Sequence, residues 1–534
     1  MNGSGLQVQC LASTRFHERG RDEQELDEDN ARYEECDSED DTQNHEENDV
    51  VRSSKGEDDA KSTLEQEHVN TSRDPTPRIS SPSPSQSSSS STSESEDSAD
   101  SSSDSIATAL SSTPHISCIQ ESQLSPDGSC ILTSDYSRSL TVYPISSTVF
   151  QPPHPKPLAP YAKLSSPDPI WSFATNPQFN LSDPSSTHVL LSRRDRYITL
   201  HNAVWSSDNT IDPNHTTHSP SPLDISTPLA SYKLISPLTE ALTAPSSLTY
   251  THDSTHFFAG IRNTIALFDI AHQSNPIQRI PTIPSARNVL KGGGVGYKGV
   301  ITALSISLPS STYHHTGILA AGTRTRWIGL YDPTSSENIS SFTLPRDGDR
   351  GARGNGVSSL KWSPDGRYLY IAERRSDVLL IYDVRSFTTC LAFCTGRKAD
   401  TNQKLGFDVW CAGAVGGFAD GASVGGAGHE KTVSHEIWAG GTDGCVRVWR
   451  DPWTKEGGVQ ADEVVRVGDG NMPVVGTMVH ASGGLAGVAC GWVGVEEDEI
   501  DGDEEKVSRS GMQRMGGVMP RIKEGGSVDI LGLR

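Results

Sequence analysis

The chain has 534 residues and a formal net charge of −23, which excludes a protein whose bulk is a basic polyanion-binding domain. The N-terminus lacks the apolar core of a signal peptide, and no apolar run approaches the ~20 residues of a membrane span. The nine cysteines are scattered without paired spacing, which indicates reduced thiols rather than disulfides. Composition therefore predicts a soluble, intracellular protein that does not contact membranes and needs no cofactor.

The first part of the chain is strongly acidic. Residues 1–105 carry 27 acidic and 9 basic side chains, whereas residues 106–494 are close to neutral. A segment so poor in apolar residues cannot bury enough surface to offset its chain entropy, so we expect a disordered, Ser-rich acidic tail over residues 1–105. The serines before acids in residues 87–105 suit an acid-directed kinase. A solvating tail and a regulated docking tail both remain open.

Short strand patterns then recur to the end of the chain. Each unit has an apolar strand, a polar hairpin and a second apolar run that ends in an aromatic residue or Asp. The paired runs cover residues 130–132 and 139–143, 189–191 and 197–202, 256–260 and 264–269, 317–322 and 327–332, 368–373 and 377–384, 437–441 and 445–449, and a weaker unit over 474–492.

The clearest unit spans residues 356–387. Its strand-like runs are separated by the turn Ser363-Pro364-Asp365-Gly366 and by a polar hairpin, which predicts antiparallel strands. Residues 379–382 are apolar on both faces, as in a strand covered on both sides, and residues 388–393 add a fourth strand. One such sheet cannot bury both faces alone, so its recurrence predicts an all-β fold, a seven-bladed WD40-type β-propeller over residues 106–494.

The ends of this propeller are less clearly marked. Residues 495–506 are acidic, so we expect the ordered body to end near Trp492 and residues 495–534 to form an acidic, mostly disordered tail. Closure of the ring then needs a strand from before the first full blade. Residues 116–124 are expected to supply that strand.

Arginines recur in the hairpins between second and third strands. Because the ring repeats the same turn in each blade, these hairpins should lie on one rim and form a local positive patch. For any single arginine, an exposed hairpin tip without a function is the alternative explanation. The hairpin arginines that we assign to RNA binding are Arg193, Arg194, Arg324, Arg326, Arg374 and Arg375.

The sequence gives little support for a metal site or for catalysis. Cys390 and Cys394 share one face of a strand, with Cys411, His429 and His435 downstream, so a zinc site is conceivable. Core packing explains these thiols better, because they lie within the apolar run TTCLAFC. No nucleophile, base and carboxylate pattern stands out, so the sequence predicts no enzyme, no catalytic residues and no metal.

Four stretches resemble one known family. They are SPDGSCILT (125–133), ERRSDVLLIYDVR (373–385), TNQKLGFD (401–408) and GGTDGCVRVW (440–449), in that order. Together they resemble the telomerase Cajal body protein family of WD40 proteins, whose related fungal members include a splicing-associated form. The most specific element is TNQ followed closely by FD, because generic WD40 repeats lack it.

The resemblance implies a non-catalytic RNA-binding adaptor. Its expected partners are small nuclear RNA, of the box H/ACA small Cajal body RNA or telomerase RNA type, and ribonucleoprotein proteins. Its expected location is the nucleus, in Cajal bodies or the nucleoplasm, and its expected state is a monomer. The matching positions implied to lie near RNA are Arg374, Arg375, Thr401, Asn402, Gln403 and Lys404.

Two functional classes remain open at this point. In one, hairpin arginines contact phosphates and bases of an unpaired RNA loop. In the other, a propeller that scaffolds proteins in pre-mRNA splicing uses its loops and acidic tail, and the arginines are incidental.

Overall fold

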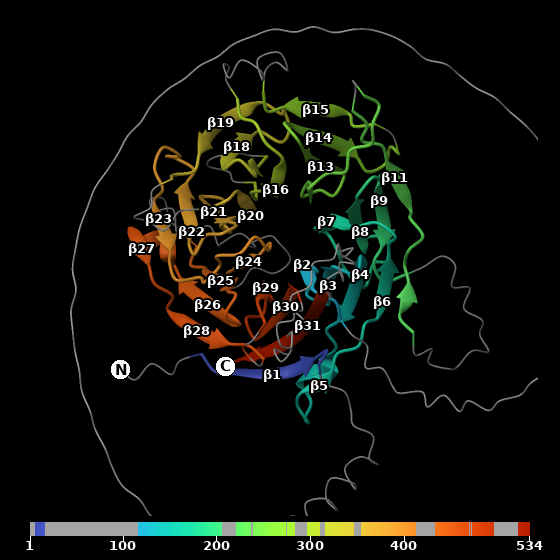
Figure 1. The fold of residues 1–534 in the computed structure, drawn as a ribbon, viewed down its shortest axis with the longest axis vertical. Helices are drawn as coiled ribbons and strands as arrows, with labels where there is room; N and C mark the ends of the chain where they lie inside the picture. The colour runs from blue at the N-terminus through green and yellow to red at the C-terminus, as the bar shows by residue number, and fades with distance from the viewer. Residues whose placement is uncertain are drawn as a thin grey trace, which may run out of the picture. The chain divides into compact units, whose positions relative to one another are not determined.

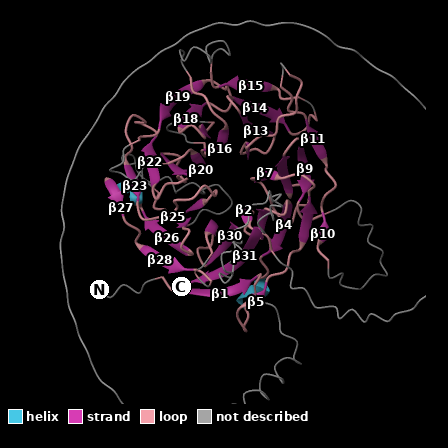
Figure 2. Ribbon diagram, in the orientation of Figure 1, coloured by secondary structure: helices cyan, strands magenta, loops and turns pink. Residues whose placement is uncertain are grey.

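The computed structural model describes residues 6–15, 116–205, 221–236, 239–273, 275–283, 296–309, 316–346, 354–412, 433–468, 470, 472–495 and 522–534. Within these residues the strands form seven sheets that are arranged as the blades of a ring (Figure 1). Apart from the short 3-10 turns η1 (Ser147–Phe150) and η3 (Pro452–Thr454), the regular structure described is strand (Figure 2). The predicted all-β, seven-bladed propeller is confirmed.

The first four blades follow the chain from its inner strands outward. Blade 1 contains β2 (Ile119–Leu124), β3 (Cys130–Asp135), β4 (Ser139–Pro144) and β6 (Ala162–Ser165), with β10 (Leu223–Asp224) at its outer edge. Blade 2 contains β7 (Ile170–Thr175), β8 (His188–Arg193), β9 (Ile198–Asn202) and β11 (Ala230–Tyr232). Blade 3 contains β12 (Ser247–Tyr250), β13 (His256–Ile261), β14 (Thr264–Asp269) and β15 (Gln278–Pro281). Blade 4 contains β16 (Ile301–Ile306), β17 (Leu319–Thr323), β18 (Trp327–Tyr331) and β19 (Asn338–Thr343).

The remaining blades complete the ring. Blade 5 contains β20 (Val357–Trp362), β21 (Tyr368–Glu373), β22 (Leu379–Asp383) and β23 (Ala392–Cys394), with β27 (Gly457–Val459) at its edge. Blade 6 contains β24 (Phe407–Trp410), β25 (Glu436–Gly440), β26 (Cys445–Arg450) and β28 (Glu463–Arg466). Blade 7 contains β29 (Val474–Val479), β30 (Leu485–Val495), β31 (Ile522–Leu533) and β1 (Val8–Ser13), with β5 (Lys156–Pro157) at its edge.

The core lies between neighbouring blades, which explains strands that are apolar on both faces. All six residues of β21 are buried. Leu369 and Ile371 pack toward blade 4 in a cluster with Ile328, whereas Tyr370 packs toward blade 6 with Ile437. Successive side chains of a strand point to opposite faces, so each blade buries itself against two neighbours. Each large aliphatic side chain buried in this way contributes about 1.5–3 kcal/mol.

The ring closes through both ends of the chain rather than through residues 116–124. Those residues contain β2, the inner strand of blade 1, and β1 is the outer strand of blade 7. β1 pairs antiparallel with β31, with Val8 opposite Leu533 and Ser13 opposite Asp529. The expectation that the ordered body ends near Trp492 is therefore wrong, because β31 is the third strand of the last blade. β1 and β31 each lie beside an acidic stretch of the sequence, so the composition averaged over that stretch hides them.

Because β1 and β31 belong to blade 7, the acidic stretches predicted as tails lie between strands of the propeller. Residues 14–118 connect β1 to β2, so the acidic stretch is an insertion between two blades. Residues 16–115 and 496–521 lie outside the described residues, and the disorder expected there is not addressed by the structure. In the part of the chain that the structure describes, no helix has the length and apolar character needed to cross a membrane.

One face of the ring collects two kinds of loop. In an antiparallel four-stranded blade, the turn between the second and third strands lies at the same end as the connection to the next blade. We call this side the hairpin face. It includes the β8–β9, β17–β18 and β21–β22 hairpins and the connection from β23 to β24, which contains residues 401–404.

Candidate nucleic-acid interface

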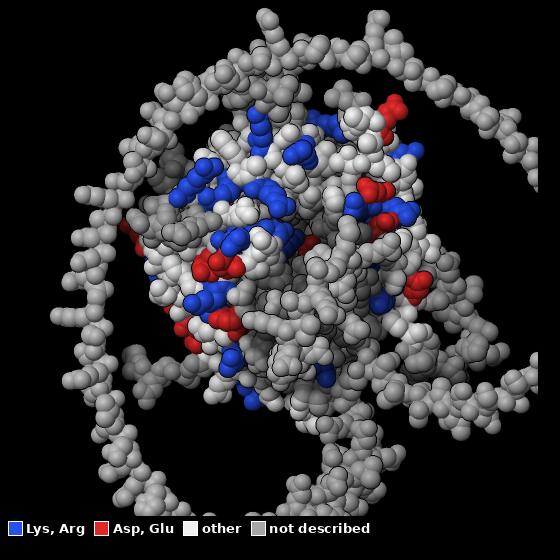
Figure 3. Space-filling view, viewed as in Figure 1, with Lys and Arg blue, Asp and Glu red and all other residues white. Residues whose placement is uncertain are grey.

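The predicted arginines lie on the hairpin face, but blade 2 and blades 4 and 5 present them in separate places. Arg193 and Arg194 lie at the β8–β9 hairpin, Arg324 at the β17–β18 hairpin and Arg374 at the β21–β22 hairpin. In the view of Figure 3, lysine and arginine side chains gather over blades 4 and 5. We call the group formed by Arg324, Arg374, Arg375, Lys398 and Asn402 the basic patch.

Two arginines of the basic patch lie close enough to repel each other. Arg324 is exposed, and its guanidinium forms no ion pair with a described residue. Arg374 is half-buried; burial lowers the pKa of its guanidinium, and the positive charge of Arg324 lowers that pKa further. A bound anion would stabilise both charged groups, because an opposite charge favours the protonated form. This pair therefore has the electrostatics of a site for an anion.

The β21–β22 hairpin is fastened to the connection that carries the TNQ sequence. Arg374 Nη1 donates a hydrogen bond to the carbonyl oxygen of Asn402. The backbone N–H of Arg375 donates to the carbonyl of Thr401 at 2.9 Å, and Arg375 Nε lies 3.1 Å from Asp400 Oδ1. Asn402 is exposed, and its side-chain amide bonds to no residue that the structure describes. The structure thus brings Arg374, Arg375, Thr401 and Asn402 together.

Arg326 has a different environment from its neighbours. Its Nε lies 2.6 Å from Glu373 Oε1 and its Nη2 lies 2.9 Å from Oε2, so the guanidinium and carboxylate form a bidentate pair. The two side chains are 11% and 1% exposed. Burial raises the pKa of the Glu373 carboxyl, and the bonds from Arg326 oppose that rise. Arg326 therefore joins blade 4 to blade 5 and presents little of its charge to solvent.

Gln403 and Lys404 lie in the connection before β24, and their side chains bond to blades 7 and 1. Gln403 Nε2 donates to the carbonyl of Gly491 in β30 at 2.9 Å. Lys404 Nζ lies 2.8 Å from Glu121 Oε1 in β2, and the two side chains are 27% and 17% exposed. These side chains connect three blades. In the fold, they hold distant segments of the chain together, and this structural role does not depend on a ligand.

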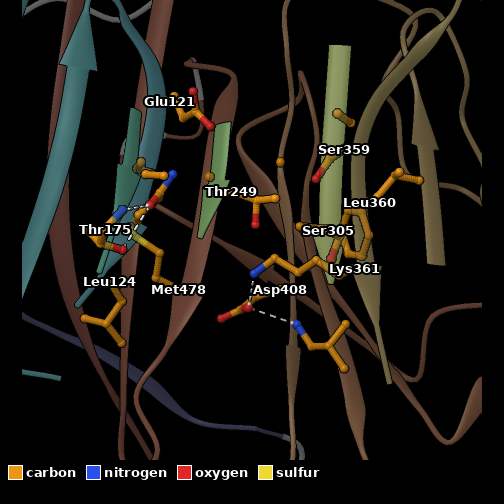
Figure 4. A pocket seen from close by; sticks show the side chains of 18 of the residues that line it. Glu121, Leu124, Thr175, Thr249, Ser305, Ser359, Leu360, Lys361, Asp408 and Met478 are labelled. Atoms are coloured by element: carbon orange, nitrogen blue, oxygen red, sulfur yellow. Dashed lines mark hydrogen bonds and ion pairs between the residues drawn. The ribbon is translucent and has the colours of Figure 1, made fainter. Parts of the chain in front are cut away.

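The end of the same sequence motif fixes the wall of the central channel. The inner strands enclose a cavity of about 640 Å³, lined by serines and threonines together with apolar residues. Asp408 Oδ1 accepts from Lys361 Nζ in β20 at 2.5 Å, and Asp408 Oδ2 accepts from the backbone N–H of Val479 in β29 at 2.8 Å. Figure 4 shows Lys361 and Asp408 pointing toward one another in this wall. The FD sequence thus links blades 5, 6 and 7.

The blade 2 arginines differ in how far they reach solvent. Arg193 is half-buried and its Nη2 donates to Thr199 Oγ1 at 3.2 Å; burial, followed by the charge of Arg196, lowers its pKa. Arg194 is exposed, with its Nε 3.3 Å from the exposed Asp195 carboxylate. An exposed pair of this kind is worth little, so Arg194 is free to exchange partners. Blade 2 therefore offers Arg194 rather than Arg193 to a ligand.

Sequence reasoning missed two basic residues just before the TNQ segment. Arg397 is fully buried and its Nη2 donates to the carbonyls of Leu405 and Gly406, both at 2.8 Å. It holds the connection in its curved course, and burial lowers its pKa to about 10. Lys398 is exposed beside it. The sequence Gly396-Arg397-Lys398 directly before the motif was the available signal, although it did not reveal that only the second basic residue faces solvent.

The residues considered for zinc have other partners. His435 Nε2 lies 2.5 Å from the Tyr370 hydroxyl and His435 Nδ1 lies 2.7 Å from the Val433 carbonyl. Cys394 is buried, and the described cysteines are free thiols. His429 lies outside the described residues. Among residues that the structure describes, no three His, Cys, Asp or Glu side chains cluster as metal ligands would.

Comparison with known proteins adds distant relatives. The chain matches no protein-family model. It is 26% identical over 349 residues to the "Guanine nucleotide-binding protein negative regulator 1" of Schizosaccharomyces pombe, an alignment that covers 64% of this chain and 73% of the relative. It is 24% identical over 315 residues to the "Telomerase Cajal body protein 1" of Bos taurus, covering 57% of this chain and 50% of the relative. The Homo sapiens protein of that name is 23% identical over 287 residues, with 53% and 44% covered.

The chain thus spans about half the length of the telomerase Cajal body proteins that it matches. The stretches that carried the resemblance have defined places in the fold: two of them form blades 1 and 5, and the TNQ and FD sequences join blades 5, 6, 7 and 1. The resemblance inferred from sequence is confirmed: this seven-bladed propeller is similar in sequence to proteins named telomerase Cajal body protein 1, and also to a fungal protein of another name.

Proposed function

We propose that this chain is a non-catalytic, RNA-binding WD40 adaptor. Its ligands are small nuclear RNAs of the box H/ACA small Cajal body RNA or telomerase RNA type, and it directs the localisation or assembly of their ribonucleoproteins in the nucleus. The names of its mammalian relatives, which contain "telomerase" and "Cajal body", support this choice of RNA class. Ribonucleoprotein proteins are its proposed protein partners, and it acts as a monomer.

The observation that carries the proposal is the proximity of Arg324 and Arg374 beside the exposed Asn402. Burial of Arg374 and repulsion from Arg324 both lower the pKa of the Arg374 guanidinium, so the free protein holds two cations in an unfavourable arrangement. A phosphate between the two guanidinium groups relieves this repulsion. A carboxylate on a protein could do so as well, but the amide of Asn402 adds a donor and an acceptor that suit a base edge.

The proposed roles divide between phosphates and bases. Arg324, Arg374, Arg375 and Lys398 contact phosphates, and Arg194 extends the positive field on blade 2. Asn402 and Thr401 contact base edges or sugars, with Gln403 and Lys404 setting the position of their segment through Gly491 and Glu121. Phosphate contacts supply affinity and base contacts supply sequence choice.

Sequencing of RNA crosslinked to the native protein tests this function. The same capture with an Arg324→Ala variant is the comparison, because Arg324 is exposed and we expect its loss to leave the fold intact. We expect small nuclear RNAs to be enriched by the wild type and lost from the variant. If neither protein enriches RNA above background, the proposal fails and a protein scaffold associated with pre-mRNA splicing becomes the better explanation.

A further inference from the structure

Exposed aromatic rings mark a second part of the hairpin face. Tyr136 lies in the β3–β4 hairpin, Trp171 near the start of β7 and Tyr197 in the β8–β9 hairpin, and they are 51%, 46% and 37% exposed. All three lie at the hairpin-face ends of blades 1 and 2. Rings of this size normally gain stability from burial, so several exposed in one sector indicate a surface that another molecule covers.

The backbone directs Trp171 away from the core. The register between β7 and β8 shifts between Ile170 and Ser172, whose residues are 4% and 3% exposed, so Trp171 occupies a bulge between two inward positions. Bulges re-aim a side chain in this way. β7 is the inner strand of blade 2, and Ser172 lines the central channel. Trp171 therefore lies beside the mouth of the channel.

Cations accompany the rings. Arg138 Nη1 donates to the carbonyl of Pro167, and Arg196 Nε lies 2.7 Å from Asp168 Oδ2, so both arginines border the connection that leads into β7. Lys233 Nζ lies 5.8 Å from the centre of the Tyr197 ring. Alternation of exposed rings with cations is the arrangement by which proteins hold single-stranded nucleic acids: bases stack on rings and phosphates meet cations.

We propose that Tyr136, Trp171 and Tyr197 form a stacking surface for unpaired bases of an RNA strand whose phosphates contact the basic patch. This inference rests on the proposed function and adds to it the form of the ligand, a single strand that crosses the mouth of the channel from blades 4 and 5 to blades 1 and 2. A duplex keeps its base faces inside its own stack, so it could not use these rings. A loop or an unpaired end could.

The test compares two probes with the same backbone charge. One is an oligouridylate about 12 nucleotides long, and the other is an abasic ribose-phosphate strand of the same length. The variants are Trp171→Leu, Arg324→Ala and, as a matched control, Trp205→Leu, whose indole is 53% exposed and which follows β9 on the opposite face. Tyr136→Leu provides a second stacking variant, and thermal unfolding establishes that each variant is folded.

We expect the wild type to prefer the oligouridylate over the abasic strand. Trp171→Leu should weaken oligouridylate binding by about 5- to 150-fold, the range for loss of one stacked base, and leave the abasic strand unchanged. Tyr136→Leu should act in the same direction. Arg324→Ala should weaken both probes alike, and Trp205→Leu should change neither.

The outcomes separate this inference from the function on which it rests. If both aromatic variants bind the oligouridylate as the wild type does while Arg324→Ala weakens both probes, the stacking surface is wrong and the RNA-binding function stands. That result would point to a protein as the occupant of the rings. If the wild type binds neither probe, the function and the stacking surface fail together.

Discussion

Lys404 Nζ lies 2.8 Å from Glu121 Oε1, although the two residues are 283 positions apart in the sequence. The ion pair joins the segment before β24 in blade 6 to β2 in blade 1, and it lies in the wall of the central channel. Gln403, the preceding residue, reaches Gly491 in the blade between them. The sequence motif that resembles the telomerase Cajal body proteins thus helps to close the ring, in addition to the proposed role of its neighbours with RNA.

Loss of this ion pair should reduce stability measurably. Lys404→Met keeps the aliphatic stem but removes the charge, and we expect the free energy of unfolding in urea to fall by about 1 kcal/mol, as for a partly exposed pair. A double-mutant cycle with Glu121→Gln isolates the interaction between the two side chains. A coupling energy near zero would show that the proximity of the two groups contributes nothing to the closed ring.

Charge reversal in the basic patch should weaken RNA binding without unfolding the protein. For Arg374→Glu with Arg375→Glu, each lost phosphate contact should reduce the log-log salt slope by roughly 0.7 for a single strand. Affinity for the RNA recovered by crosslinking, measured at several salt concentrations, gives this slope. Asn402→Ala should instead change the choice between that RNA and a scrambled loop, because its amide suits base edges.

A matched control lies in the same blade. Arg385, in the connection after β22, has a side chain that is 56% exposed and pairs with Asp383, and it lies on the face opposite the hairpins. Arg385→Glu changes the net charge as each of the other substitutions does. If it reduced RNA affinity as much as a reversal at Arg374, binding would follow overall charge rather than the basic patch.

Arg326 should behave differently from the arginine beside it. Arg326→Ala leaves the buried Glu373 carboxylate without its bidentate partner, and removal of one member of a buried pair typically costs about 3–5 kcal/mol. Arg324→Ala, two residues away at an exposed position, should change stability by less than about 0.5 kcal/mol. Urea unfolding of the two variants checks this contrast. Equal stabilities would contradict the assignment of Arg326 to the joint between blades 4 and 5.

The sequence predicted the parts of this structure that depend on local pattern. The apolar run from Leu379 to Tyr382 shows that its strand is covered on both sides, and the position of Arg374 in a hairpin places it on a shared face. Side-chain direction within a hairpin depends on distant neighbours instead. Arg326 turns toward Glu373, 47 residues later, whereas Arg324 does not, and nothing in TRTR distinguishes them. The strands β1 and β31 were missed for a related reason, since each is defined by a partner at the other end of the chain.

A buried histidine should make the fold sensitive to acid. His201 is fully buried, with Nδ1 3.0 Å from the Ile225 carbonyl and Nε2 2.8 Å from Thr199 Oγ1, and burial lowers its pKa to about 4. Between its usual value of 6.5 and about 4 the unfolded chain binds the proton that the folded chain does not, so stability falls as pH falls through that range. The loss from this group should be about 3 kcal/mol. Urea unfolding at several pH values should show a shallower decline in His201→Gln; an unchanged pH profile would contradict the assignment.

Closure through both ends of the chain gives the last prediction. Asp529 in β31 accepts from Ser13 Oγ at 2.5 Å and lies 2.9 Å from Arg15 Nη2, so one carboxylate, 4% exposed, holds the end of β1. Asp529→Ala should lower the free energy of unfolding by about 3 kcal/mol, because Ser13 and Arg15 lose their bonds to this buried carboxylate. The matched control is Asp195→Ala. The Asp195 side chain is 78% exposed, so this substitution should change stability by less than about 0.5 kcal/mol.

Deletion of residues 522–534 should have a much larger effect than Asp529→Ala, since it removes β31 and leaves β1 and β30 as unpaired edges in an open ring. We expect that truncated protein to aggregate or to lack a cooperative thermal transition. A soluble, cooperatively folding monomer without residues 522–534 would show that β31 is dispensable, and that the blade closes by another pairing.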